Sequence, residues 1–79
     1  MKLPRDLSGN ELSQKLKFFG YSVTRQSGRH MRLTTTLNGE HHITIPDHDS
    51  LKVGTLSAIL DDVASHQKIT KEEVIQKIS

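Results

Sequence analysis

Histidine and arginine side chains lie close together around one glycine, and together they could act on a phosphate group. His30 comes two residues after Gly28, with Arg29 before it and Arg32 two positions further along. An imidazole can take or give a proton near neutral pH, and a guanidinium group binds phosphate oxygens well. A single histidine in such a place is more often an ordinary surface residue of a strand. The spacing nevertheless marks His30 as a candidate acid–base group, with Arg29 and Arg32 as candidate phosphate ligands.

A second candidate phosphate site lies at the start of a predicted helix. Lys52 and the residues up to Thr55 precede apolar residues spaced as in a helix, over residues 56–63. The first N–H groups of a helix are unpaired and lie at the positive end of its dipole, so they accept phosphate readily. Simple capping of the helix by Thr55 explains the same residues without any ligand.

The five histidines do not form a metal-binding pattern. His41 and His42 are adjacent in a predicted strand, so their side chains point to opposite faces, and at most one could join His48. The chain has no cysteine and no HExxH motif. We therefore expect no metal site and no other cofactor.

The first element that must position these groups is a helix over residues 8–19. Ser8 can cap this helix, and Glu11, three residues later, can complete a capping box. Apolar residues then recur at helical spacing, and Gly20 supplies the C-terminal stop.

From Tyr21 onward the apolar residues alternate with polar ones, which predicts three short antiparallel strands. A three-residue loop at residues 37–39 pairs Leu33 with Ile43 and Met31 with Ile45, so that apolar residues share one face. The same reasoning makes residues 26–28 the first loop, pairing Val23 with Met31 and Tyr21 with Leu33. The predicted buried face then comprises Tyr21, Val23, Met31, Leu33, Ile43 and Ile45. The predicted polar face comprises Thr24, His30, Arg32, Thr34, His42 and Thr44.

A helix over residues 56–63, entered at Thr55, and a last segment that begins with a capping box at residues 70–73 complete the chain. The element order is α-β-β-β-α with a short terminal helix. This order predicts an α+β fold, with the helices on one face of a three-stranded antiparallel sheet.

Length and composition limit the number of domains and the class of protein. Seventy-nine residues allow a single domain, over residues 1–79, and the absence of cysteine argues against a disulfide-bonded secreted protein. No apolar run approaches the ~18 residues of a membrane span, so we expect a cytoplasmic protein with no membrane partner. Residues 1–35 carry a net charge of +5 and residues 36–79 a net charge of −3. A basic half of this kind suggests a polyanionic partner, although an ordinary solvated surface has the same composition.

Six segments, in order along nearly the whole chain, carry a family resemblance. They are residues 2–5, 8–12, 19–21, 24–30, 43–48 and 51–56. Together they resemble the HicA-type (YcfA-like) toxins, which are mRNA interferases that act without the ribosome and are neutralised by a HicB-type antitoxin. The resemblance implies the fold of a double-stranded-RNA-binding domain, in agreement with the predicted element order.

The resemblance also implies roles for individual residues. The family's catalytic histidine follows a Gly-Ser pair, and this chain has Gly28-Arg29-His30, with Arg29 in place of the serine. The resemblance therefore assigns catalysis to His30. The helix entry that matches the family, where this fold commonly meets a phosphate backbone, contains Lys52, Gly54 and Thr55. His48 matches a position that we interpret as fixing a loop.

These observations predict the toxin of a HicAB-like type II toxin–antitoxin system, an mRNA endoribonuclease with His30 as general acid or base. RNA would be bound by Arg29, Arg32, Lys52, Gly54 and Thr55. The expected partners are mRNA and a HicB-like antitoxin, with the free toxin a monomer and a larger complex formed with the antitoxin. Two alternatives stay open: a non-catalytic module that binds double-stranded RNA, and a protein-interaction domain, which would show no salt-dependent RNA binding.

Overall fold

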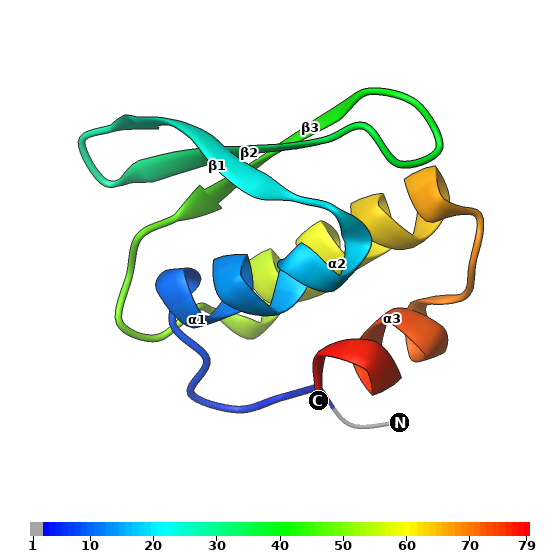
Figure 1. Ribbon diagram of the computed structural model, residues 1–79. Coiled ribbons are helices and arrows are strands. Elements are labelled where there is room, and N and C mark those ends of the chain that lie inside the picture. The colour runs from blue at the N-terminus through cyan, green and yellow to red at the C-terminus, as the bar shows by residue number, and fades with distance from the viewer. Residues whose placement is uncertain (1–2) are drawn as a thin grey trace.

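The computed structural model describes residues 3–79, so Lys2 of the first matching segment lies outside the described residues. The sheet forms one layer and the helices form the other (Figure 1). The elements are α1 (Gly9–Lys15), η1 (Leu16–Phe19), β1 (Ser22–Ser27), β2 (His30–Thr35), β3 (His41–Pro46), α2 (Val53–Gln67) and α3 (Lys71–Ile78). The predicted α-β-β-β-α order, with a three-stranded antiparallel sheet and a terminal helix, is confirmed.

The first helix begins as predicted and changes character before it ends. Ser8 caps α1, and both hydrogen bonds of the capping box with Glu11 are present. The last turn, η1, is a 3₁₀ helix, and Gly20 ends it with a φ of 82°. A left-handed φ of this size favours glycine, which explains why the stop is sharp.

The pairing of β2 with β3 follows the predicted register. Leu33 pairs with Ile43 and Met31 pairs with Ile45, and all four side chains are buried. Gly39, in the loop between these strands, has a φ of 98°. The alternation of apolar residues was therefore sufficient to predict the register between β2 and β3.

The predicted pairing of β1 with β2 is wrong. The first loop is not residues 26–28 but the two-residue turn Gly28-Arg29, closed by the pair Ser27 and His30. Gly28 has a φ of 57° while Arg29 does not have a positive φ, as expected for a hairpin turn with glycine in its first central position. Val23 consequently pairs with Leu33 rather than Met31, and a β-bulge lies between Val23 and Arg25.

Val23 is also more exposed than predicted. All six residues of β1 are exposed, and the Val23 side chain is 45% exposed. The strand order β1-β2-β3 makes β1 an edge strand. Tyr21, just before β1, is 1% exposed and belongs to the core as predicted.

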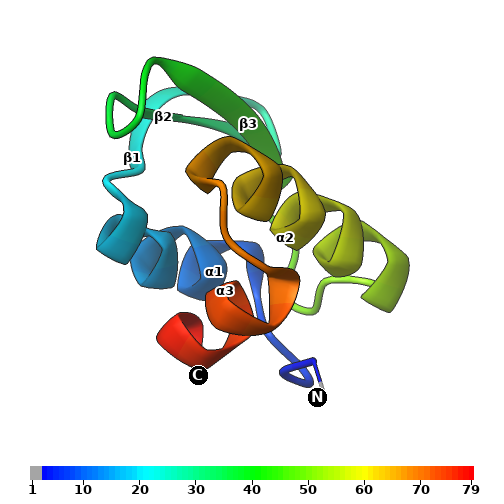
Figure 2. The same cartoon turned by 90° about the vertical axis from the view of Figure 1, so that its right-hand side faces the viewer.

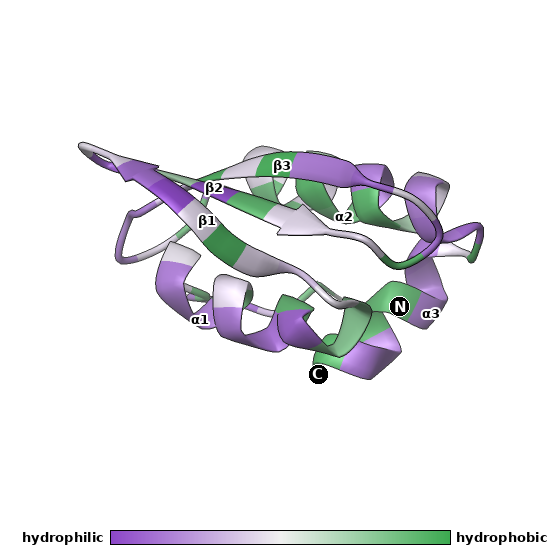
Figure 3. Cartoon of the chain, turned by 45° about the horizontal axis from the view of Figure 1, so that its top comes forward, coloured by the Kyte–Doolittle hydropathy of each residue, from purple (hydrophilic) through white to green (hydrophobic). Residues whose placement is uncertain are grey.

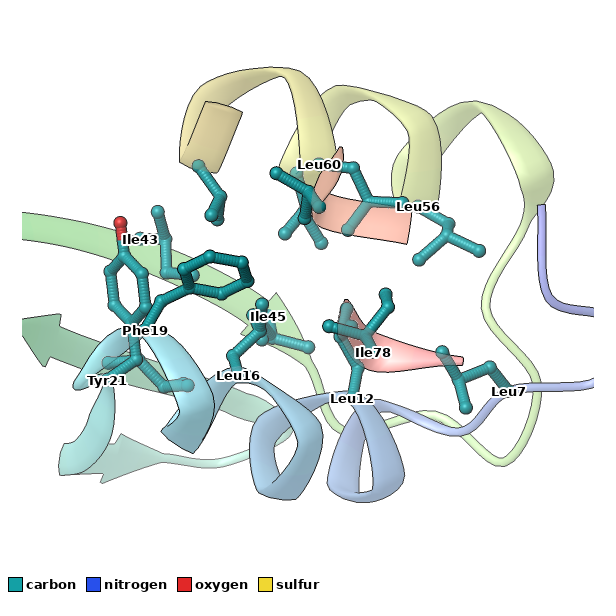
Figure 4. Packing of buried hydrophobic residues seen from close by; sticks show 14 of the residues in the cluster. Leu7, Leu12, Leu16, Phe19, Tyr21, Ile43, Ile45, Leu56, Leu60 and Ile78 are labelled. Atoms are coloured by element: carbon teal, nitrogen blue, oxygen red, sulfur yellow. The ribbon is translucent and has the colours of Figure 1, made fainter. Parts of the chain in front are cut away.

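The helices cover one face of the sheet and enclose a single hydrophobic core (Figure 2). Side chains from α1 and η1, from β2 and β3, and from α2 and α3 meet in this core, and Figure 4 shows Leu12, Leu16, Ile45 and Leu60 converging there. The other face of the sheet is open, and Figure 3 shows hydrophilic segments in purple beside the pale tip of the turn between β1 and β2. No helix within residues 3–79 is long and apolar enough to span a membrane.

The start of α2 differs from the prediction. The helix begins at Val53 with Lys52 as its N-cap, so Thr55 is the third helical residue and not the cap. Extended backbone at Lys52, with a ψ of 145°, ends the preceding loop one turn earlier than the apolar spacing indicated. The capping box of the last helix, between Thr70 and Glu73, is confirmed.

Candidate functional site

His30 is the first residue of β2 and lies on the open face of the sheet. It is exposed, whereas the next residue, Met31, is 3% exposed and faces the helices. Its neighbours on the adjacent strands are Ser27 and Pro46. Within residues 3–79 the imidazole of His30 makes no hydrogen bond and no ion pair, so both ring nitrogens are free to meet a ligand.

Arg32 accompanies His30 on the open face, as predicted, and a second arginine that the sequence analysis missed lies opposite it. Arg25 pairs with Arg32 across β1 and β2, and both side chains are exposed. Regular alternation from Val23 would have turned Arg25 toward the helices, but the bulge inserts one extra residue, Thr24. A signal for this was present, because glycine in the first position of a two-residue turn would have predicted the pair Arg25 and Arg32.

Arg29 ties the turn between β1 and β2 to the end of β3. Its carbonyl oxygen accepts a hydrogen bond of 2.7 Å from the N–H of Asp47, and its guanidinium Nη2 donates to the carbonyl oxygen of Asp47 over 3.2 Å. Gln26 adds a bond of 3.2 Å to the Asp47 carboxylate. Arg29 therefore braces the turn before His30 against the end of β3.

The three residues predicted to bind RNA at the start of α2 form a group separate from His30. Lys52 caps α2 without a side-chain hydrogen bond, so the first N–H groups of the helix have no side-chain acceptor at the cap. A β-carbon added to Gly54 would meet nothing within 4 Å. A hollow at this place is lined by Pro4, Arg5, Asp6, Ser50, Leu51, Lys52, Val53 and Leu56, and includes no residue of β1 or β2. The structure thus brings His30 and Arg32 together, with Arg29 in the adjoining turn, and places Lys52, Gly54 and Thr55 elsewhere.

The loop between β3 and α2 is held through its backbone to the start of α1 and to the segment just before it. The N–H of Gly9 donates to the carbonyl oxygen of His48 over 2.9 Å, and the N–H of Leu51 donates to the carbonyl oxygen of Leu7 over 2.8 Å. The role of His48 in fixing this loop belongs to its backbone, because its side chain is exposed. Gly9 packs so closely that a β-carbon would lie 2.0 Å from the carbonyl oxygen of Pro46.

A chain of hydrogen bonds crosses the open face beside the arginines. Glu40 Oε2 lies 2.7 Å from His42 Nε2, His42 Nδ1 lies 2.8 Å from Thr34 Oγ1, and Thr34 Oγ1 lies 2.9 Å from Thr24 Oγ1. A carboxylate only accepts, so His42 Nε2 donates to Glu40. Thr24 Oγ1 is also 3.4 Å from the carbonyl oxygen of Arg32.

His41 points the other way, toward α2, as expected for adjacent residues of a strand. Its Nε2 donates to Asp62 Oδ1 over 3.2 Å, and its Nδ1 accepts from the Tyr21 hydroxyl over 2.7 Å. The His41 ring stacks on His66, with ring centroids 4.3 Å apart. Burial raises the pKa of the Tyr21 hydroxyl above its usual range. This tyrosine–histidine cluster is structural in character.

Among residues 3–79 no group of three or more histidine, aspartate and glutamate side chains is arranged to hold a metal ion. The exposed side chains of His30, Arg25 and Arg32 on the open face offer proton transfer by an imidazole and binding of anions by guanidinium groups.

Comparison with known protein families gives the same family as the sequence motifs. The family model described as the HicA toxin of bacterial toxin–antitoxin systems matches residues 9–64, which include β1 to β3 and most of α2. No curated protein and no solved structure matches the chain significantly. The family match covers more than half of the sequence and contains His30, Arg32 and the start of α2. The chain belongs to the HicA toxin family of bacterial toxin–antitoxin systems.

Proposed function

We propose that this toxin is an mRNA endoribonuclease in which His30 transfers a proton during cleavage. The observation that carries the proposal is the free imidazole of His30, which lies exposed at the start of β2, two residues from Arg32. The other side chains that could transfer a proton on this face, His42 and Glu40, are already hydrogen-bonded to each other.

RNA is cleaved when a 2′-hydroxyl oxygen attacks the adjacent phosphorus, so that a 2′-O–P bond forms and the P–O5′ bond breaks. This reaction requires three things. A base removes the hydroxyl proton, cations stabilise the negative charge that develops on the phosphorus oxygens, and an acid protonates the leaving 5′-oxygen. His30 can serve as the base or the acid. Arg32, and Arg29 in the adjoining turn, can supply positive charge. Water can complete the proton balance, since the open face is accessible to solvent.

The start of α2 is the second RNA contact that we propose. The first N–H groups of this helix, the ammonium group of Lys52 and the open space over Gly54 suit a phosphate of the RNA backbone. Thr55, half-buried in the first turn, adds a hydroxyl donor. The loop after β3 connects this group to the His30 turn, because Asp47 is bonded to Arg29. One RNA chain would then contact both groups.

The antitoxin partner that the family implies is, we propose, HicB-like and covers His30 in the complex. Blocking the exposed imidazole and its basic neighbours is the most direct way to silence such a site. Acidic residues on the antitoxin would complement the net charge of +5 of residues 1–35. If His30 were as accessible to solvent in the complex as in the free toxin, inhibition would require another explanation.

The experiment compares His30→Ala with His48→Ala, a matched control that removes another exposed imidazole. Purified wild type and both variants are incubated with a long mRNA, and the rate of cleavage, the melting temperature and RNA affinity are measured. We expect His30→Ala to lose about 10²–10⁴-fold in rate while the melting temperature stays unchanged. His48→Ala should cleave as wild type does.

Two outcomes would overturn the proposal. Undiminished cleavage by His30→Ala would refute the catalytic role. Salt-dependent binding of double-stranded RNA by the wild type, with no cleavage of any RNA, would establish the non-catalytic module instead.

A further inference from the structure

The strongest unexplained feature of the open face is the pair formed by Arg25 and Arg32. The two residues are direct cross-strand partners, and like charges in such positions repel each other. The ion pairs within residues 3–79 join His41 to Asp62, His42 to Glu40 and Lys71 to Asp61. No carboxylate therefore compensates either arginine in the part of the chain that the structure describes.

The pair depends on the bulge in β1. Without the extra residue, Arg25 would face the helices and Arg32 would stand alone. Thr24 is held in the bulge by Thr34, at 2.9 Å between hydroxyl oxygens, and by the carbonyl oxygen of Arg32, at 3.4 Å. His42 and Glu40 fix Thr34 in turn. A hydrogen-bonded network that holds two like charges together is consistent with a binding site for an anion.

The pair also lies beside His30. Arg32 is two residues along β2 from His30, a distance of about 6.6 Å between their Cα atoms. Arg25 is two residues from Ser27, which is the cross-strand partner of His30. An anion held between the two guanidinium groups is therefore within reach of the imidazole.

We propose that Arg25 and Arg32 bind one phosphate of the RNA, the phosphate whose ester bond is cleaved with the help of His30. This inference rests on the proposed function and assigns a role to Arg25. Guanidinium groups bind phosphate oxygens in a bidentate manner, and two of them can stabilise the additional negative charge of the transition state. Thr24 is a positioning residue, since its hydroxyl holds the bulge that brings Arg25 to the open face.

The test separates binding from cleavage. Binding is measured with a single-stranded RNA that carries 2′-O-methyl groups throughout and therefore cannot be cleaved through its 2′-hydroxyls. Wild type, Arg25→Gln, Arg25→Lys and the control Lys17→Gln are titrated at several salt concentrations. Lys17 is an exposed cation in η1, on the helical side of the molecule.

We expect Arg25→Gln to lose about tenfold in affinity, as for a hydrogen bond to a charged group. The slope of log K against log salt should become less steep by about 0.7, which corresponds to one phosphate of a single strand. Arg25→Lys should keep the slope but not the cleavage rate, because an ammonium group cannot reproduce the guanidinium geometry. Lys17→Gln should leave both affinity and slope as in the wild type.

Cleavage of unmodified RNA, measured in parallel, shows which proposal fails. We expect Arg25→Gln to cleave about 10²-fold more slowly than wild type. An unchanged slope and cleavage rate in Arg25→Gln, with His30→Ala inactive, would overturn the phosphate site and leave the proposed function intact. A reduced slope in Arg25→Gln, with His30→Ala fully active, would support the phosphate site and overturn the role of His30.

Discussion

The two ends of the sheet use histidine in opposite ways. At the end formed by β3 and the loop after β2, His41 donates to Asp62 and accepts from Tyr21, and His66 donates to the carbonyl oxygens of Leu37 and Gly39, 3.0 Å away in each case. At the other end, the imidazole ring of His30 makes no hydrogen bond and no ion pair within residues 3–79. Hydrogen bonds made inside the protein stabilise the fold, whereas a ring that makes none is available to a ligand. Internal partners thus mark a structural histidine. The rings of His30 and His48 both lack such partners within residues 3–79, and His30 differs by its place two residues from Arg32 on the open face.

The largest effect on stability is expected where the His30 end is held by backbone packing. Gly9→Ala would place a β-carbon 2.0 Å from the carbonyl oxygen of Pro46 and force α1 away from the end of β3. We expect a loss of about 3 kcal/mol in the free energy of unfolding, measured by urea denaturation. The matched control is Gly54→Ala, where the β-carbon meets nothing and the helix should gain up to about 1 kcal/mol. Similar results for both variants would show that the His30 end is not held by this contact.

The next effect tests the comparison of the two histidines directly. His41→Ala removes the partner of the buried Tyr21 hydroxyl, and we expect it to cost about 2 kcal/mol of stability. Cleavage by the folded variant should stay close to that of the wild type. His30→Ala should show the reverse, with a change in stability below about 0.5 kcal/mol. Thermal denaturation and cleavage assays of both variants check this, and equal losses of stability would break the distinction.

A smaller effect is expected at His66, which holds the loop between β2 and β3 to α2. Since carbonyl oxygens only accept, Nε2 of His66 carries the proton, and His66→Ala removes this donor. We expect a loss of about 1 kcal/mol and faster hydrogen exchange in residues 36–40. Exchange at the turn between β1 and β2 serves as the internal control and should not change. Equal acceleration at both turns would mean that the two ends are not independent.

The smallest expected effect on stability is a gain rather than a loss. Arg25→Thr relieves the repulsion between Arg25 and Arg32, and we expect it to stabilise the free protein by about 0.3 kcal/mol at low salt. Salt screens exposed charges, so the gain should shrink as the ionic strength rises. Denaturation curves at low and high salt measure it, with Lys17→Thr as the control. A loss of stability that does not depend on salt would show that the two arginines do not repel each other.

The sequence predicted the parts of the fold in which apolar residues alternate strongly. Met31 and Leu33 in β2 and Ile43 and Ile45 in β3 allowed only one register, and that register is present. β1 offered a single apolar residue, Val23, and an exposed edge strand places almost no constraint on that residue. The turn between β1 and β2 therefore decided the register of β1. Because this turn was interpreted as a three-residue loop, every predicted residue pair between β1 and β2 was wrong.

The difference between strands with strong apolar alternation and β1, which lacks it, also limited the prediction of the site. His30 and Arg32 lie on the well-determined strand β2, so their common face was predictable from alternation. Arg25 lies beyond the bulge, and its face depends on a backbone irregularity that hydrophobic patterning does not encode. The separation of Lys52, Gly54 and Thr55 from His30 could not be predicted either, because spacing along the chain does not place a helix terminus relative to the open face of a sheet.

The bulge at Thr24 has a second consequence, for the behaviour of many copies of the toxin in solution. A free edge strand displays unpaired N–H and C=O groups that can pair with the edge of another molecule and start aggregation. The irregular backbone between Val23 and Arg25 interrupts the flat ladder that such association needs, and the charge of Arg25 repels an identical edge. The distortion that aims an arginine at the open face thus also protects the sheet from self-association.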